Sequence, residues 1–404
     1  MKRGAALCVV LLLALSYSGS AQKVTRSRQV PGLRTYDTDL AVMSREEKDS
    51  VRMVTELWKN YVDSYSDASV SEEMRRSMWV DGMEDYLAEF DDGVLLYSSF
   101  RENRILDVRK IAPGTYQMSV LTSSKLPGED YYGWNECVYR LCAMNVAKTD
   151  DRNGKYNPFR LCNWLDAVIP TLSKTSVGRL DYYCAPGCKV PSTSAEDVSG
   201  FVDAMIDEYG FSFEDRIRYV VAPTVDQCEQ FSGYLFNAYS NPMMSSAVPK
   251  AADFNFYGRA FGSSTIVSNY YDDLHDLALL IVRSCSPEAF PMIQEGFASF
   301  HGGYMSNSYE SLKSSLKEYI ESHKEIDFSD EDLFYDLTMP VKGVESTVVV
   351  PLEGLLGALF VEYAWKNGGP MLVKKLLSCH DYPEILKIFI VKPEAAGSFI
   401  KKLL

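Results

Sequence analysis

The chain has 404 residues and a formal net charge of −14 at pH 7, with 55 Asp and Glu against 41 Lys and Arg. This acidic excess makes nucleic acid and anionic membranes poor partners. No run of 18 apolar residues occurs beyond the first 21 residues, so no transmembrane segment is expected there, and the length accommodates two ordinary domains.

The first 21 residues have the pattern of a secretory signal peptide. Lys2 and Arg3 precede an apolar run over 5–15, and small residues follow at 18–21. The run is about half of the roughly 20 residues that span a bilayer, which disfavours a membrane anchor. We therefore predict an exported protein, periplasmic or secreted, that loses residues 1–21 and keeps residues 22–38 as a flexible leader.

Nine cysteines are present, and one of them, Cys8, lies in the signal peptide. An even number of remaining cysteines in an exported chain predicts disulfides. The local pairing of Cys184 with Cys188 across Ala-Pro-Gly is the most favoured. Zinc binding by the same two thiols is the alternative, but no second pair of cysteines or histidines follows at the spacing of a zinc ribbon or finger.

Residues 39–177 are predicted to form an α+β domain. Ser44 and Glu47 make a capping box ahead of a helix with one apolar face, and a second helix follows over 74–87. Strands are then expected over 94–97, 105–111, 115–121, 138–146 and 156–165. The last two would form a hairpin across Asn153-Gly154, because asparagine–glycine accepts the positive φ angles of a tight turn.

This order of two helices and a curved antiparallel sheet resembles the cone-shaped fold of the nuclear transport factor two family, over about residues 39–175. The resemblance rests on element order and contains no motif. Such cones serve as enzymes, binding pockets and spacers, so the resemblance implies a fold without an activity.

Strands and helices alternate from residue 178. Strands are expected over 180–183, 216–221, 254–261 and 265–267. Ser194 with Asp197 and Thr224 with Gln227 are predicted to cap the intervening helices, and Gly210 ends the first of them. Beyond residue 295 the chain is mainly helical, and Gly368-Gly369-Pro370 separates two helices.

One segment has the spacing of a zinc-peptidase site. Such a site places two histidines at i and i+4 on one helix face, a glutamate general base beside the first, and a third ligand on a later Glu-Gly helix. His275 and Glu295 occupy the first and third ligand positions, and Asp276 stands at the general-base position. Leu279 occupies the second ligand position, where a histidine is required.

The region over about residues 178–404 resembles the gluzincin metallopeptidases often called peptidase-MA-like. The resemblance rests on the order of its strands, on the His275 helix and on the segment 294–300 followed by Gly302-Gly303. The resemblance implies a small sheet followed by a helical subdomain. It makes His275 and Glu295 remnants of a ligand set. Because Leu279 replaces a ligand and Asp276 is one methylene shorter than glutamate, the resemblance implies a fold that has lost its hydrolysis.

Structural roles compete with these readings. A histidine beside apolar residues is commonly a hydrogen-bonded structural side chain, and Glu295 near Pro291 has the position of a solvated or helix-capping carboxylate. Two residues are candidates for a missing zinc ligand. His301 is six residues past Glu295 and faces elsewhere on an ideal helix, whereas Asp272 lies at i−3 from His275.

The first functional hypothesis is an exported, catalytically inactive metallopeptidase homologue that serves as a peptide-binding, protein-binding or scaffold module without a cofactor. An extended peptide would pair with an edge strand over 254–267, in the cleft near His275 and Glu295. The alternative is a divergent zinc metallopeptidase that uses His275, Glu295 and a non-standard third ligand. A third hypothesis is a structural envelope protein, with an apolar plug around Leu279.

Overall fold

The computed structural model describes residues 44–66, 69–80, 101–125, 134–145, 157–237, 258–261, 264–305, 307–334, 337–342 and 347–404. The predicted signal peptide, leader, strand at 94–97 and Asn153-Gly154 turn lie outside these residues. The chain divides into two compact units, one of Met1–Trp164 with Gly233–Ala238 (unit 1) and one of Leu165–Ser232 with Tyr239–Leu404 (unit 2). Both units combine helices with strands, which confirms the predicted α+β class.

Unit 1 begins with α2 (Arg45–Ser66), and the predicted capping box is present at its start. The Glu47 N–H donates to Ser44 Oγ at 3.2 Å, and the Ser44 N–H donates to Glu47 Oε2 at 3.0 Å. The buried face of α2 includes Val54 and Trp58. Of the predicted second helix, the described residues contain one short helix, α3 (Glu72–Arg76).

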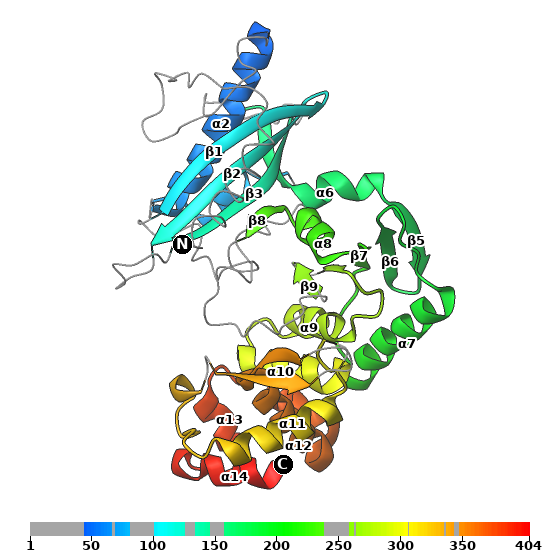
Figure 1. The fold of residues 1–404 in the computed structure, drawn as a ribbon, viewed down its shortest axis with the longest axis vertical. Helices are drawn as coiled ribbons and strands as arrows, with labels where there is room; N and C mark the ends of the chain where they lie inside the picture. The colour runs from blue at the N-terminus through cyan, green and yellow to red at the C-terminus, as the bar shows by residue number, and fades with distance from the viewer. Residues whose placement is uncertain are drawn as a thin grey trace, which may run out of the picture. The chain divides into compact units, whose positions relative to one another are not determined.

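The sheet of unit 1 is antiparallel, in the order β1-β2-β3-β4, with β8 also paired to β3. The long strands β1 to β3 lie beside α2 (Figure 1). Its strands are β1 (Arg101–Ala112), β2 (Thr115–Lys125), β3 (Trp134–Asn145), β4 (Phe159–Asn163) and β8 (Tyr234–Asn237). The predicted pairing of the last two strands before residue 165 is present, with Leu141 opposite Asn163 and Asn145 opposite Phe159.

The sheet of unit 2 has the order β5-β6-β7-β10-β9. Strands β6, β7 and β10 run parallel to one another, whereas β5 and β9 are antiparallel to their neighbours and form the two edges. The strands are β5 (Ser173–Val177), β6 (Leu180–Cys184), β7 (Ile217–Val221), β9 (Gly258–Phe261) and β10 (Thr265–Ser268). The three inner strands are almost entirely buried, as expected for parallel strands covered on both faces.

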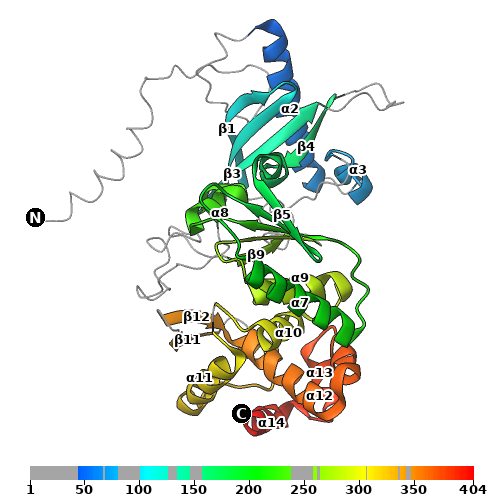
Figure 2. The same cartoon turned by 90° about the vertical axis from the view of Figure 1, so that its right-hand side faces the viewer.

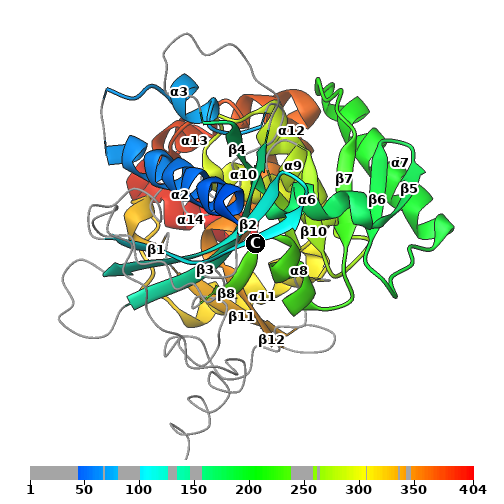
Figure 3. The same ribbon diagram turned by 90° about the horizontal axis from the view of Figure 1, so that it is seen from above.

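Helix α7 (Ser192–Tyr209) connects the parallel strands β6 and β7, and helix α8 (Val225–Phe231) follows β7. Helix α7 lies beside β5 and β6 (Figure 3), and it ends at Gly210, whose left-handed φ of 55° confirms the predicted stop. Its predicted start at Ser194 is wrong, because Pro191 occupies the N-cap with no side-chain bond. Helix α8 begins as predicted, with the Gln227 N–H donating to Thr224 Oγ1 at 3.3 Å.

The rest of unit 2 is mainly helical (Figure 2). Its helices are α9 (Leu274–Cys285), α10 (Pro291–Gly302), α11 (Tyr309–Ser322), α12 (Leu352–Leu376), α13 (Tyr382–Ile388) and α14 (Ala396–Leu403), with a hairpin of β11 (Thr338–Lys342) and β12 (Thr347–Pro351). Gly369 breaks α12 with φ 60° and ψ −155°, at the predicted position. Among the described residues, no helix is both long enough and apolar enough to cross a membrane.

The predicted Cys184–Cys188 disulfide is wrong, because both residues have free thiols. Cys184 ends β6 with its side chain buried in the core of unit 2. The Cys188 N–H donates to the Ala185 carbonyl at 2.9 Å. A backbone hydrogen bond therefore closes this turn, and burial raises the pKa of both thiols.

Candidate functional site

The start of α9 is fixed by Asp273. Its Oδ1 accepts the Asp276 N–H at 3.2 Å, and its Oδ2 accepts the Ser268 hydroxyl at 3.2 Å. The Asp273 N–H donates to the Tyr219 hydroxyl at 2.9 Å, so β7 and β10 hold this cap in place. Because the helix begins at Leu274, Asp272 precedes the cap and is exposed, which removes the geometry that favoured it as a ligand.

The structure brings His275, Asp276 and Glu295 together. Helix α10 places Glu295 Oε2 3.7 Å from His275 Nε2, and Asp276 Oδ1 lies 3.4 Å from His275 Nδ1. The predicted proximity of the first and third positions is therefore present. Two further side chains join them, since Ser299 Oγ is 3.4 Å from His275 Nε2 and Arg283 Nη2 donates to Glu295 Oε1 at 3.1 Å.

Tyr304 is a site residue that the sequence reasoning missed. Its ring meets the His275 ring edge-on, with centroids 4.9 Å apart and planes at 90°. Gly302 and Gly303 end α10 and turn the chain toward His275. A Cβ on Gly302 would lie 2.4 Å from the backbone nitrogen of His275. The sequence signal for this contact was the glycine pair itself, which marks a close backbone approach.

Electrostatics in the site favour a charged imidazole. Burial alone lowers the pKa of His275, but the bond to Asp276 and the charge of Glu295 outweigh burial and raise it. Burial, followed by the charge of Asp276, holds the pKa of Asp273 well above its ordinary value. The carboxyl groups of Asp276 and Glu295 thus favour the protonated form of His275, and the surroundings of Asp273 disfavour its charged form.

The donor set does not fit a zinc site. Two tetrahedral ligands of zinc lie about 3.3 Å apart, close to the 3.7 Å between His275 Nε2 and Glu295 Oε2. Leu279, however, is 5 % exposed and belongs to the apolar core, and no group of three His, Cys, Asp or Glu side chains among the described residues could hold a metal ion.

His301 does not supply the missing ligand. Its Nε2 lies 2.8 Å from the Tyr209 hydroxyl, and its ring packs against Phe297 and Phe300. Burial lowers the pKa of His301 to about 4, so it stays neutral near neutral pH. The expectation that His301 faces away from Glu295 agrees with these contacts, which are all made within an aromatic cluster.

The edge strand β9 packs against the carboxyl groups of Asp273 and Asp276. A Cβ on Gly258 would lie 1.8 Å from Asp273 Oδ2 and 2.5 Å from Asp276 Oδ2. The backbone of β9 therefore packs directly on both carboxyl groups, which only glycine allows at this position.

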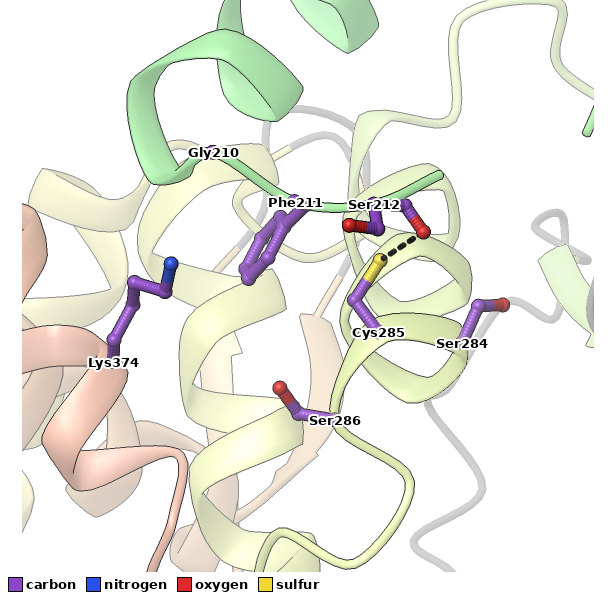
Figure 4. Close-up of a pocket in the computed structure, with 7 residues that line it drawn as sticks. All are labelled: Gly210, Phe211, Ser212, Ser284, Cys285, Ser286 and Lys374. Carbon is purple, nitrogen blue, oxygen red and sulfur yellow. Dashed lines mark hydrogen bonds between the residues drawn. The ribbon is translucent and has the colours of Figure 1, made fainter. Parts of the chain in front are cut away.

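A cavity of about 310 Å³ lies at the other end of α9. Cys285 and Ser286 line it together with Phe211, Ser212 and Lys374 (Figure 4). The Cys285 thiol donates to the Ser212 carbonyl at 3.8 Å. None of these residues is among the predicted site residues, so this cavity is separate from the His275 site.

Comparison of the whole chain with protein-family models, with curated proteins and with solved structures finds no match.

Proposed function

We propose that unit 2 is a catalytically inactive, metallopeptidase-like module that binds an extended peptide. One observation carries this proposal: the antiparallel edge strand β9 packs against the start of α9, with Gly258 on the carboxyl groups of Asp273 and Asp276. In gluzincins, which this region resembles in sequence, an edge strand above the zinc helix pairs with the peptide. Within the described residues, β9 pairs with β10 alone, and we propose that the peptide pairs with its other edge.

The charges of the site support binding without catalysis. Glu295 is paired with Arg283 and faces His275, and His275 in turn faces Asp276. The raised pKa of His275 favours the protonated ring, which has no lone pair for a metal. Arg283 thus places a positive charge beside Glu295, and the Asp276 carboxyl group at the general-base position contacts His275.

For unit 1 we propose a separate binding or spacer role. The packing of α2 beside an antiparallel sheet is consistent with the cone-shaped fold that the sequence resembles. We also propose that the whole protein is exported, on the strength of the signal-peptide pattern over residues 1–21.

The test of peptide binding uses the full mature chain and a phage-displayed library of random linear peptides. A selected peptide is synthesised twice, once unmodified and once with alternate backbone nitrogens methylated. Fluorescence anisotropy should show at least about tenfold weaker binding of the methylated form, because its N–H groups no longer pair with β9. Equal binding of both forms, failure to select any peptide, or cleavage of the peptide detected by mass spectrometry would each contradict the proposal.

A further inference from the structure

One buried acceptor in the site has no partner. Asp276 is 8 % exposed, and its Oδ2 accepts no hydrogen bond from any described residue. Its other oxygen, Oδ1, faces His275 Nδ1. A buried carboxylate oxygen without a hydrogen-bond partner destabilises the protein, and a donor supplied by a bound ligand would remove that cost.

The neighbouring basic side chains contact other oxygens of the cluster. His275 lies between Asp276 Oδ1 and Glu295 Oε2, and Arg283 donates to Glu295 Oε1. Both oxygens of Asp273 accept bonds from within the protein. Asp276 Oδ2 is thus the acceptor of this cluster that remains unsatisfied among the described residues.

Asp276 Oδ2 lies directly against the edge strand β9 at Gly258. Both Asp273 Oδ2 and Asp276 Oδ2 lie within 2.5 Å of the point where a Gly258 side chain would begin. No side chain of β9 therefore stands between these two oxygens and the Gly258 backbone, which packs on them. A strand added beside β9 would direct every second side chain to the α9 face of the sheet.

We infer that the peptide bound along β9 carries a lysine or arginine whose cationic group donates to Asp276 Oδ2 beside Gly258. This inference rests on the proposed function and names its specificity. The acidic balance of the site agrees with it, since Glu295 adds a second carboxylate whose side chain is 31 % exposed. A charge-assisted bond of this kind makes one peptide position select for a basic residue.

The test compares peptide selections on three proteins: the native chain, Asp276→Asn and Asp272→Asn. Asp276→Asn keeps the shape of the side chain and removes its charge, while Asp272→Asn removes the same charge from an exposed neighbour outside the cluster. Sequencing should show lysine and arginine enriched at one position on the native chain and on Asp272→Asn, with that enrichment lost on Asp276→Asn. Equal enrichment on all three proteins, or none on any, would overturn the inference.

A second measurement needs no protein variant. Replacing the selected lysine by norleucine should weaken binding to the native chain at least about tenfold, and an unchanged affinity would overturn the inference. The same titration in millimolar calcium chloride tests for a free cation, because loss of the lysine preference there would assign Asp276 to an inorganic ion instead. If unmethylated and methylated peptides bind equally, the proposed function fails. If only the preference for a basic residue is absent, this inference alone fails.

Discussion

His301 and His275 occupy one domain, yet their surroundings shift the two pKa values in opposite directions. His301 lies among aromatic rings with one hydroxyl partner, so burial decides and its pKa falls to about 4. His275 is the more deeply buried of the two, but the carboxyl groups of Asp276 and Glu295 outweigh burial and raise its pKa. The direction of each pKa shift therefore depends on nearby carboxyl groups, whose positions in space the sequence does not give.

The pH dependence of stability should contain a component from His301. The unfolded chain binds a proton near pH 6.5, whereas folded His301 stays neutral down to about pH 4. Its contribution is therefore fully present above pH 6.5, decreases as the pH falls, and reaches a loss of about 3 kcal/mol below pH 4. In His301→Gln the fall in the free energy of unfolding between neutral pH and about pH 4 should be smaller, as measured by urea denaturation. An identical pH profile in both proteins would show that His301 does not bind its proton on unfolding.

Ile390 stores backbone strain that glycine would relieve. It has a φ of 56° and is 93 % exposed at the end of α13, where the Val391 N–H donates to the Leu386 carbonyl as in a Schellman motif. The left-handed conformation costs a residue with a Cβ roughly 1–2 kcal/mol. We expect Ile390→Gly to stabilise the protein by about 1 kcal/mol in thermal unfolding. The control is Lys392→Gly, at a φ of −83°, which should not stabilise, and a gain in both variants would contradict this account.

At the scale of elements, the packing of α10 on α12 explains one residue, Gly296, of the segment 294–300 that resembles a peptidase sequence. Gly296 lies against Gly357, so that a Cβ on Gly296 would stand 2.2 Å from the Gly357 carbonyl carbon. A Cβ on Gly357 would in turn stand 2.0 Å from the Met292 carbonyl oxygen. The glycine after Glu295 is therefore required by helix packing, whatever the chemistry of the site.

Gly296→Ala should destabilise unit 2 by about 1–3 kcal/mol, because both clashing groups are backbone atoms that cannot move independently. Gly354→Ala is the matched control at the same interface, since its Cβ would meet Glu295 Cβ at an ordinary 3.6 Å. That variant should be neutral, or stabilised by up to about 1 kcal/mol from helix propensity. Thermal unfolding followed by circular dichroism measures both, and equal effects of the two substitutions would argue against the close helix crossing.

Local signals in the sequence predicted local structure well. The capping box at Ser44, the N-cap at Thr224 and the stops at Gly210 and Gly369 are all present, because each depends on a few neighbouring residues. The start of α7 was missed because Pro191, rather than a side-chain cap, precedes its first turn. The disulfide was wrong because cysteine spacing does not show which thiol enters a core.

The site was predictable only where one helix face or one known spacing defined it. The spacing of His275 and Glu295 predicted their proximity, and 3.7 Å separates them. Tyr304 and Arg283 reach the same cluster from a turn and from the far end of α9, which no periodic pattern indicates. The approach of Gly258 depends on strand order, and strand order arises from contacts distant in sequence.

At the scale of the whole molecule, we propose that unit 2 binds peptides without catalysis, with Arg283 paired to Glu295 in place of a bound metal. This unit contains the edge strand β9, the carboxyl groups at the start of α9 and the ion pair between Arg283 and Glu295. The central claim is that the site works without zinc, because Leu279 stands at the second ligand position and His275 faces carboxylates on both sides.

The most direct test is the zinc content per mature chain, measured by elemental analysis after zinc loading and mild desalting, for the native protein and for His275→Ala. The account predicts far less than one zinc per chain in the native protein and no further loss in the variant, because two protein ligands hold zinc too weakly to survive desalting. Close to one zinc per native chain, lost in His275→Ala, would contradict the account and favour a divergent metallopeptidase.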